Sequence, residues 1–167
     1  CVFCSTFAEY FKNDMNKEFQ MLAKTFKGLE QVLAKELIEL GANNVQIERR
    51  AVSFTGDKRM LYTANFCLRT ASRVLVPIAT FKAKTTDDTY EQVKLLDWAQ
   101  YMTAKNTFQI DATVYSDLFR HSQCITYRVK DAIVDWWMEH GGVRPSVQLT
   151  NPDLYLNVHI AGDTVTL

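Results

Sequence analysis

Apolar residues in the first half of the chain alternate between the spacing of a strand and the spacing of a helix. Every second residue from Phe19 to Ala23 is apolar, which is typical of a half-buried strand. The next apolar residues recur three and four positions apart, until Gly41 marks a helix end. The predicted elements are a strand from Glu18, a helix from Gly28 to Leu40, two hairpin strands around Arg49 and Arg50, a helix from Met60 to Ala71 and a strand from Val74 to Ala79. This order, β-α-β-β-α-β, is the split βαβ pattern of ferredoxin-like domains.

The second half of the chain has the pattern of another α/β domain, with one long helix as its clearest element. Helical spacing of apolar residues runs from Ser122 to His140, and Gly141 and Gly142 then end the helix. The other predicted elements are a helix from Thr85 to Trp98 and strands at Phe108–Val114, Ser146–Leu149, Leu154–Ile160 and Thr164–Leu167. We therefore predict an α+β chain, with a ferredoxin-like domain at residues 15–84 and a second α/β domain at residues 85–167.

The sequence at each end of the chain predicts how the folded part begins and ends. Residues 1–14 lack the basic opening and apolar stretch of a signal peptide, and Met15 is a plausible native start, so we expect a leader outside the fold. The chain stops at Leu167 within a predicted strand. We therefore expect more protein beyond that residue, the alternative being a complete chain whose last strand is docked in a sheet.

Composition indicates a globular protein, and the distribution of charge indicates a polyanionic partner. The 167 residues are 47% hydrophobic, and no apolar run approaches the roughly 18 residues of a membrane-spanning helix. Lys and Arg total 19, as do Asp and Glu. The charges are nevertheless segregated, because residues 15–84 hold twelve basic and six acidic residues and residues 85–167 hold six basic and eleven acidic ones. We expect a soluble protein with no membrane contact.

The sequence shows no pattern of a cofactor, metal or catalytic site. Closely spaced glycines after a strand, which many nucleotide and S-adenosylmethionine sites need, are missing. The segment Asn151-Pro152-Asp153-Leu154 lacks the second proline and the aromatic ring of the Asn-Pro-Pro-aromatic loop of amino-group methyltransferases, so we interpret it as a turn. None of the three histidines, His121, His140 and His159, belongs to a recognisable catalytic constellation.

Cysteine usage points to a reducing compartment, and therefore to the cytoplasm. Cys1 and Cys4 have the spacing of a metal or redox motif, but no second ligand pair follows at a suitable distance. Cys67 and Cys124 stand in apolar helical patterns, where no disulfide framework is expected.

Two basic windows without acidic residues are the candidate chemistry of this chain. They hold Arg69, Arg73, Lys82 and Lys84 between residues 69 and 86, and Arg120, His121, Arg128 and Lys130 between residues 118 and 130. Arginine forks and lysine point charges suit phosphate oxygens, so these residues are predicted to position nucleic acid without reading its sequence. An alternative for Arg128 and Lys130 is pairing with Asp131 or Asp135 on the helix surface. Phe119 and Tyr127 are candidates for stacking on bases, although Tyr127 also has the spacing of a core aromatic.

Several ordered motifs together give the chain a family resemblance. They are Leu68-Arg69-Thr70-Ala71-Ser72-Arg73-Val74-Leu75, Tyr90-Glu91-Gln92-Val93-Lys94 with Asp97-Trp98, Arg120-His121-Ser122-Gln123, Arg128-Val129-Lys130-Asp131-Ala132-Ile133-Val134-Asp135 and Arg144-Pro145-Ser146-Val147. Over residues 19–167 the chain resembles the THUMP-containing ribosomal RNA guanine-N2 methyltransferases of bacteria. The resemblance implies that residues 85–167 are a THUMP RNA-binding domain. It also adds Arg144 to the predicted RNA contacts and allows Arg69 and Arg73 to be structural instead.

The resemblance further implies a division of labour. This segment would grip structured large-subunit ribosomal RNA, and a catalytic domain after Leu167, using S-adenosylmethionine, would methylate the exocyclic amine of a guanine. The chain itself would hold no cofactor and be inert alone. Two alternatives stay open: a THUMP module of a transfer RNA-modifying enzyme, and a ferredoxin-like domain that binds a small regulatory molecule.

Overall fold

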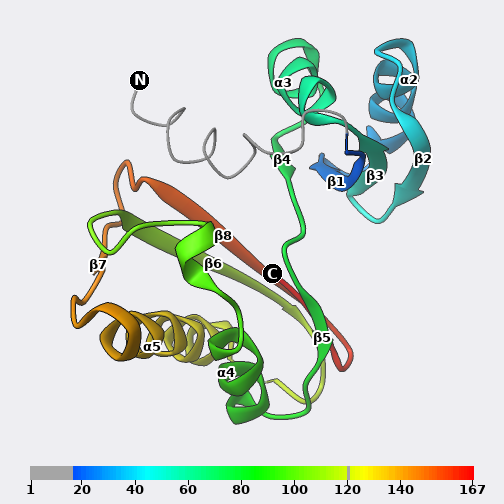
Figure 1. Ribbon diagram of the computed structural model, residues 1–167. Helices are drawn as coiled ribbons and strands as arrows, with labels where there is room; N and C mark the ends of the chain where they lie inside the picture. Colours follow the sequence, from blue (N-terminus) through cyan, green and yellow to red (C-terminus); the bar gives the residue numbers. More distant parts are fainter. Residues whose placement is uncertain (1–16, 120) are drawn as a thin grey trace. The chain divides into compact units, whose positions relative to one another are not determined.

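The structure, a computed structural model, describes residues 17–119 and 121–167 (Figure 1). The chain forms two compact units, which meet in sequence between Pro77 and Ile78. Each unit has its own sheet and its own hydrophobic core. The predicted leader, residues 1–14, and Arg120 lie outside the described residues.

The first unit has the predicted ferredoxin-like topology. Its elements are β1 (Phe19–Lys24), α2 (Glu30–Glu39), β2 (Asn43–Glu48), β3 (Ala51–Gly56), α3 (Lys58–Cys67) and β4 (Arg73–Leu75). The strands pair antiparallel in the order β2-β3-β1-β4. Met21 and Ala23 of β1, Leu33 and Leu37 of α2 and Leu61 of α3 pack in one core, as the alternation and the helical spacing predicted.

The second helix of this unit is shorter than its apolar pattern. We predicted that it reaches Ala71, but α3 ends at Cys67, and Leu68 already has extended backbone angles. The cause lies outside the helix. The carboxylate of Glu36, on α2, accepts hydrogen bonds from the backbone N–H of Thr70 at 3.3 Å and from its hydroxyl at 2.9 Å, so residues 69–72 form a turn instead.

The second unit is a five-stranded mixed sheet with two helices. Its elements are β5 (Thr80–Lys82), α4 (Thr86–Lys94), a 3₁₀ turn η2 (Trp98–Gln100), β6 (Thr107–Tyr115), α5 (Ser122–Gly141), β7 (Ser146–Val147), β8 (Leu154–Ala161) and β9 (Thr164–Thr166). The strand order is β5-β9-β8-β6-β7. Strands β6 and β8 are parallel over eight residues, and the chain between them passes through α5, which makes a βαβ unit. The ferredoxin-like and α/β units together confirm the α+β class.

Strand β5 was not predicted, and it moves the border between the two units. Its pairing partner is β9, and Ile78 donates a backbone hydrogen bond of 2.8 Å to Leu167. Ala83 is buried in the second core. Residues 78–84, which the sequence pattern assigned to the ferredoxin-like domain, therefore pack with the second unit, because their partners lie about eighty positions later in the chain.

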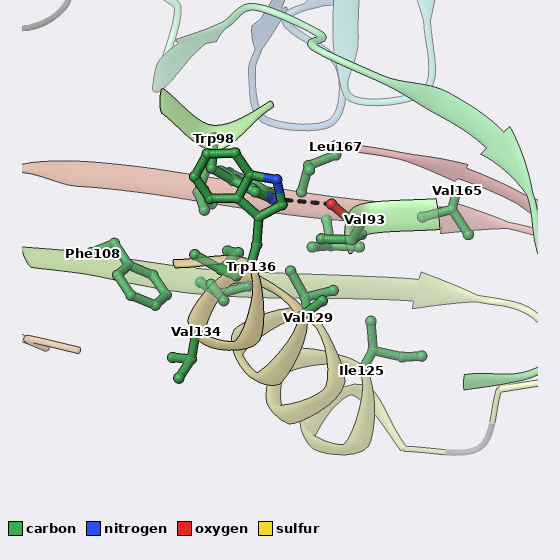
Figure 2. Packing of buried hydrophobic residues seen from close by; sticks show 14 of the residues in the cluster. Val93, Trp98, Phe108, Ile125, Val129, Val134, Trp136, Val165 and Leu167 are labelled. Carbon is green, nitrogen blue, oxygen red and sulfur yellow. Dashed lines mark hydrogen bonds between the residues drawn. The ribbon is translucent and has the colours of Figure 1, made fainter. Parts of the chain in front are cut away.

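The core of the second unit is built around Trp98 and α5 (Figure 2). The Trp98 ring is fully buried, and its Nε1 donates a 3.0 Å hydrogen bond to the carbonyl oxygen of Val93. The predicted helix up to Trp98 is interrupted, since α4 ends at Lys94 and Asp97 accepts a hydrogen bond from Ala99 to start η2. Helix α5 matches its prediction and ends at Gly142, whose φ of 64° suits glycine.

The described residues contain neither a membrane-spanning helix nor a cluster of metal-ligating side chains. Within residues 17–119 and 121–167, no helix has the length and apolar character needed to cross a membrane. The same residues contain no group of three or more His, Cys, Asp or Glu side chains placed to hold a metal ion. Cys1 and Cys4 lie outside this part of the chain. Cys67 and Cys124 are exposed free thiols, so the prediction of apolar surroundings was wrong: both face outward from their helices.

Candidate nucleic-acid interface

Helices α4 and α5 run side by side in the same direction. Arg128 pairs with Asp87, and Lys94 pairs with Glu139 about two turns further along α4 and about three turns further along α5. Residue numbers rise together along both helices, so both helices begin at the same end of the unit. The carboxyl end of β6, which leads into α5, lies at that end too. The first turns of the two helices therefore lie on one side of the second unit; α4 has a capping box formed by Thr85 and Asp88, and α5 has no side-chain cap among the described residues.

The seam between the helices carries Arg128, one of the predicted phosphate contacts. Its guanidinium contacts the Asp87 carboxylate and lies 4.9 Å from the centroid of the Tyr90 ring. The hydrogen bond to Asp87 raises the pKa of Arg128. Tyr90 in turn donates a 2.8 Å hydrogen bond to Asp135, which raises the pKa of the phenol. Arg128 thus has a carboxylate partner, but on α4 rather than at Asp131 or Asp135.

Lys130 of α5 and Lys94 of α4 are paired as well. Lys130 lies 2.7 Å from a carboxylate oxygen of Asp131, which confirms the pairing alternative for this lysine. Lys94 lies 2.6 Å from Glu139, and this contact raises the pKa of the lysine. An RNA phosphate at this seam would have to compete with carboxylates that already hold the cations.

The end at which both helices begin gathers cations from the two basic windows. Lys82, on β5, lies 3.1 Å from Asp163 in the β8–β9 turn, and it lowers the pKa of that carboxyl. Lys84 is exposed immediately before Thr85, the residue that caps α4. The hydroxyl of Ser116, at the end of β6, donates a 2.6 Å hydrogen bond to Gly162 in the same turn. These contacts tie β5, the β8–β9 turn and the end of β6 together.

The start of α5 completes this surface. His121 precedes the helix and is exposed, as is Ser122, and no side-chain hydrogen bond among the described residues caps the helix. No acidic residue stands in its first turn. An open groove of about 730 Å³ lies beside it and is lined by Ala112, Thr113, Val114, Tyr115, Ser116, Asp117, Phe119 and Ser122. We call Lys82, Lys84, His121 and Ser122 the helix-start surface.

The two candidate stacking residues differ in exposure: Phe119 is buried and Tyr127 is exposed. Phe119 is only 4% exposed and belongs to the hydrophobic core, so it is not placed to stack on a base. Tyr127 is 60% exposed, so its interpretation as a core aromatic was wrong. Position on α5 decides this, because Tyr127 lies on the face away from Ile125 and Val129, which are buried.

The remaining predicted contacts do not belong to the helix-start surface. Arg144 is exposed after the far end of α5, whose twenty residues span about 30 Å. Arg69 and Arg73 belong to the first unit, where both are exposed. Arg120 lies outside the described residues. The structure therefore gathers Lys82, Lys84 and His121 and separates them from Arg144.

The turn at Asn151-Pro152-Asp153 holds two strands together. The Asp153 carboxylate accepts hydrogen bonds from the backbone N–H of Thr107 at 2.8 Å and from the Thr107 hydroxyl at 3.0 Å. These bonds lower the pKa of Asp153. They join the start of β8 to the start of β6, which supports the interpretation of this segment as a turn.

Comparisons with known proteins agree with both units. The RlmL ferredoxin-like domain family matches residues 20–75, and the THUMP domain family matches residues 83–167. The chain belongs to the THUMP domain family and carries an RlmL-type ferredoxin-like domain before it. This confirms the resemblance drawn from its motifs.

Its relatives include methyltransferases of ribosomal RNA. The chain is 40% identical over 153 residues to the ribosomal RNA large subunit methyltransferase K/L of Syntrophotalea carbinolica, which covers 92% of this chain and 22% of the relative. It is 34% identical over 151 residues to the enzyme of the same name from Desulfotalea psychrophila, covering 90% and 21%. The methyltransferase SMU.472, solved in complex with SAH, superposes with a TM-score of 0.75 and 25% identity over 91% of this chain and 41% of its own. The chain spans about a fifth of the length of the two curated relatives.

Proposed function

We propose that this chain is the RNA-binding portion of a ribosomal RNA large-subunit methyltransferase. It positions structured ribosomal RNA for a catalytic domain that transfers a methyl group from S-adenosylmethionine to the N2 amine of a guanine. The relatives named for large-subunit methylation and the SAH-bound structural neighbour support this assignment. The same relatives support a cytoplasmic location.

The observation that carries the proposal is the common starting end of α4 and α5. Helix α5 begins there with no acidic residue in its first turn and presents partial positive charge, whereas α4 is capped by Thr85 and carries Asp87 and Asp88 in its first turn. Lys82, Lys84 and His121 add side chains that suit phosphate oxygens. Arg120, which precedes His121 in the same motif, lies outside the described residues and stays a predicted phosphate contact. We propose that the helix-start surface makes the primary phosphate contacts, and that Arg128 and Lys130 join when phosphate displaces their carboxylates.

Three further arginines would enlarge the RNA-binding surface. Arg144 at the far end of α5, and Arg69 and Arg73 on the ferredoxin-like unit, are separate points of contact in this proposal. Contacts spread over two small domains suit a structured RNA, which is recognised by shape and backbone rather than by sequence.

The described residues do not fit S-adenosylmethionine. The described glycines with positive φ stand singly in turns or at helix ends, at Gly28, Gly41, Gly142 and Gly162, and none opens a loop between a parallel strand and its helix. The contribution that we propose for this chain is therefore binding and orientation of RNA, with the methyl transfer carried out by the catalytic domain.

Fluorescence anisotropy tests the proposal. The chain is titrated into a labelled large-subunit ribosomal RNA hairpin, a transfer RNA and a small anionic dye at several salt concentrations. We expect salt-dependent binding to the hairpin and none to the dye. Preference for transfer RNA would favour a tRNA-modifying parent, and binding of neither RNA at low salt would overturn the proposal.

A matched pair of variants locates the contact. Replacing Lys82 and Lys84 by Gln should weaken hairpin binding and reduce the salt slope by about two, roughly one for each lost phosphate contact. Lys105→Gln is the control, since this exposed lysine precedes β6 at the opposite end of the strand. Equal effects of the double variant and the control would remove the helix-start surface from the interface.

A further inference from the structure

Three loops of the ferredoxin-like unit are tied together at one end of its sheet. Thr25, only 7% exposed, donates its backbone N–H to the carbonyl oxygen of Arg50 at 2.9 Å. Its hydroxyl donates a 2.7 Å hydrogen bond to the carbonyl oxygen of Thr70. One buried residue thus joins the β1–α2 loop, the β2–β3 hairpin and the α3–β4 turn. We call residues 25–28, 49–50 and 69–72 the three-loop end.

Each of the three loops brings cationic side chains to this end. Lys27 stands in the first loop, Arg49 and Arg50 form the hairpin turn, and Arg69 stands in the third. All four are exposed. The three loops follow one another at intervals of about twenty residues in the sequence, so their meeting at one end of the sheet is a property of the fold.

The carboxylates of Glu30 and Glu36 accept hydrogen bonds from backbone N–H groups of these loops. Glu30 accepts hydrogen bonds from the backbone N–H of Gly28 at 2.6 Å and of Arg50 at 3.3 Å. Its own backbone amide first, and then those of Gly28 and Arg50, lower the pKa of this carboxyl. Glu36 binds the backbone N–H of Arg69 and Thr70 in the same way. These carboxylates fix the shape of the loops, and Glu48 beside the hairpin is the third acidic group near the four cations.

The hairpin turn holds an arginine in a backbone conformation that favours other residues. Arg50 has a φ of 59°, a region in which two-residue hairpin turns normally place Gly or Asn. A bulky side chain in this region carries conformational strain, and strain of this kind clusters at functional sites. Retaining arginine here keeps a positive charge at the tip of the hairpin.

The same end exposes an aromatic ring. Phe26, between Thr25 and Lys27, is 72% exposed, although exposing an apolar ring to water costs free energy. An exposed aromatic ring among cations is the arrangement with which proteins bind single-stranded nucleic acid, because every base can stack on the ring and the cations follow the backbone.

We propose that the three-loop end binds an unpaired segment of RNA, with Phe26 stacking on a base and Arg50 and Arg69 contacting phosphates. The inference rests on the proposed function for the identity of the partner, but it uses a surface of the first unit, separate from the helix-start surface. The excess of cations over carboxylates favours a polyanion over an apolar protein surface as the occupant.

Phe26→Leu is the sharpest test, because leucine keeps an apolar side chain and removes the ring face. The probes are fluorescein-labelled octaadenylate and a 16-base-pair RNA duplex, with the full chain in anisotropy titrations. Stacking is worth about 1–3 kcal/mol per base, so we expect octaadenylate affinity to fall about tenfold and duplex affinity to change less than twofold. Unchanged octaadenylate affinity, or an equal loss with both probes, would overturn the inference and favour an apolar partner.

The cations are tested with substitutions that the backbone tolerates. Arg50→Asn suits the positive φ, and Arg69→Gln keeps the backbone N–H that Glu36 binds. The double variant should weaken octaadenylate binding and lower its salt slope, whereas Lys35→Gln, an exposed lysine on α2, should not. Equal slopes for both variants would contradict phosphate contact. Circular dichroism melts check that each variant folds.

The two proposals fail in different ways. If wild type binds the hairpin but not octaadenylate, the proposed function stands and the three-loop inference is overturned. If wild type binds octaadenylate, and Phe26→Leu weakens this binding about tenfold while the ribosomal hairpin is not bound, the inference stands as a single-strand site and the ribosomal assignment fails.

Discussion

The guanidinium of Arg128 lies 4.9 Å from the centre of the Tyr90 ring and at the same time contacts the Asp87 carboxylate. This arginine therefore bridges α5 and α4 on the outside of the second unit. It is at once a structural link between two helices and a candidate ligand for phosphate. A phosphate must compete with the Asp87 carboxylate for the guanidinium, so the strength of this ion pair controls whether Arg128 can bind RNA.

Asp87→Asn should strengthen binding of the ribosomal RNA hairpin. Removing the carboxylate takes away a competitor for Arg128 and one negative charge from the RNA-facing side, so both affinity and salt slope should rise, the slope by up to about one. Arg128→Ala combined with Lys130→Ala should have the opposite effect, weakening binding about equally for different RNA sequences. Anisotropy titrations at several salt concentrations measure both.

Asp97→Asn serves as the control for this pair. Asp97 is an exposed carboxylate at the start of η2, away from Arg128, and its loss changes net charge by the same amount. A rise in affinity equal to that of Asp87→Asn would show that net charge alone, and not release of Arg128, controls binding.

Trp98→Ala should destabilise the second unit by about 3–5 kcal/mol, because it removes a fully buried ring and the hydrogen bond from its Nε1 to the Val93 carbonyl oxygen. All three tryptophans, Trp98, Trp136 and Trp137, belong to this unit. The fluorescence of the two that remain therefore follows its unfolding in urea. An unchanged midpoint would contradict the central place of Trp98 in this core.

Gly56→Val should destabilise the first unit without altering the tryptophan transition. A Cβ at Gly56 would lie 2.6 Å from both the Cβ and the Cγ of Met60, so α3 must shift away from the end of β3. Overpacking of this kind typically costs about 1–3 kcal/mol. Circular dichroism follows both units and tryptophan fluorescence follows one, so a fluorescence midpoint that moves equally would show that the units unfold together.

Acid should weaken the second unit through Asp153 and Asp163. Hydrogen bonds from Thr107 and from Lys82, respectively, hold the pKa of these carboxyls below the ordinary value of 3.8. A depressed folded pKa stabilises the protein at pH values above 3.8, and this contribution disappears as pH falls through the folded pKa. The melting temperature should therefore drop below about pH 4. Asp153→Asn should lower it at pH 7 and flatten the acid part of the profile, which thermal melts between pH 7 and 2.5 measure.

Local patterns predicted most of the elements. The alternation around Met21 and the spacing of Ile125, Val129 and Ile133 follow from burial of one face, so strand β1 and helix α5 were readable from the chain alone. The order of six elements identified the ferredoxin-like unit, and ordered motifs identified the THUMP resemblance. Lys82, Lys84 and His121 of the helix-start surface were all among the candidates.

Contacts between distant positions decided what the patterns left open. Strand β5 exists because β9 pairs with it, α3 ends early because Glu36 binds the following turn, and Phe119 is buried while Tyr127 is exposed because of how α5 faces its sheet.

The sequence by itself determined the types of most elements, the charge distribution and the family, because each depends on residue identity and short-range spacing. Only the tertiary structure decided which side chains share a surface: Lys84 with His121, Arg128 with Asp87, and Arg50 with Arg69 through Thr25. The physical reason is that such pairings join positions that are 20 to 45 residues apart, and no local periodicity carries that information.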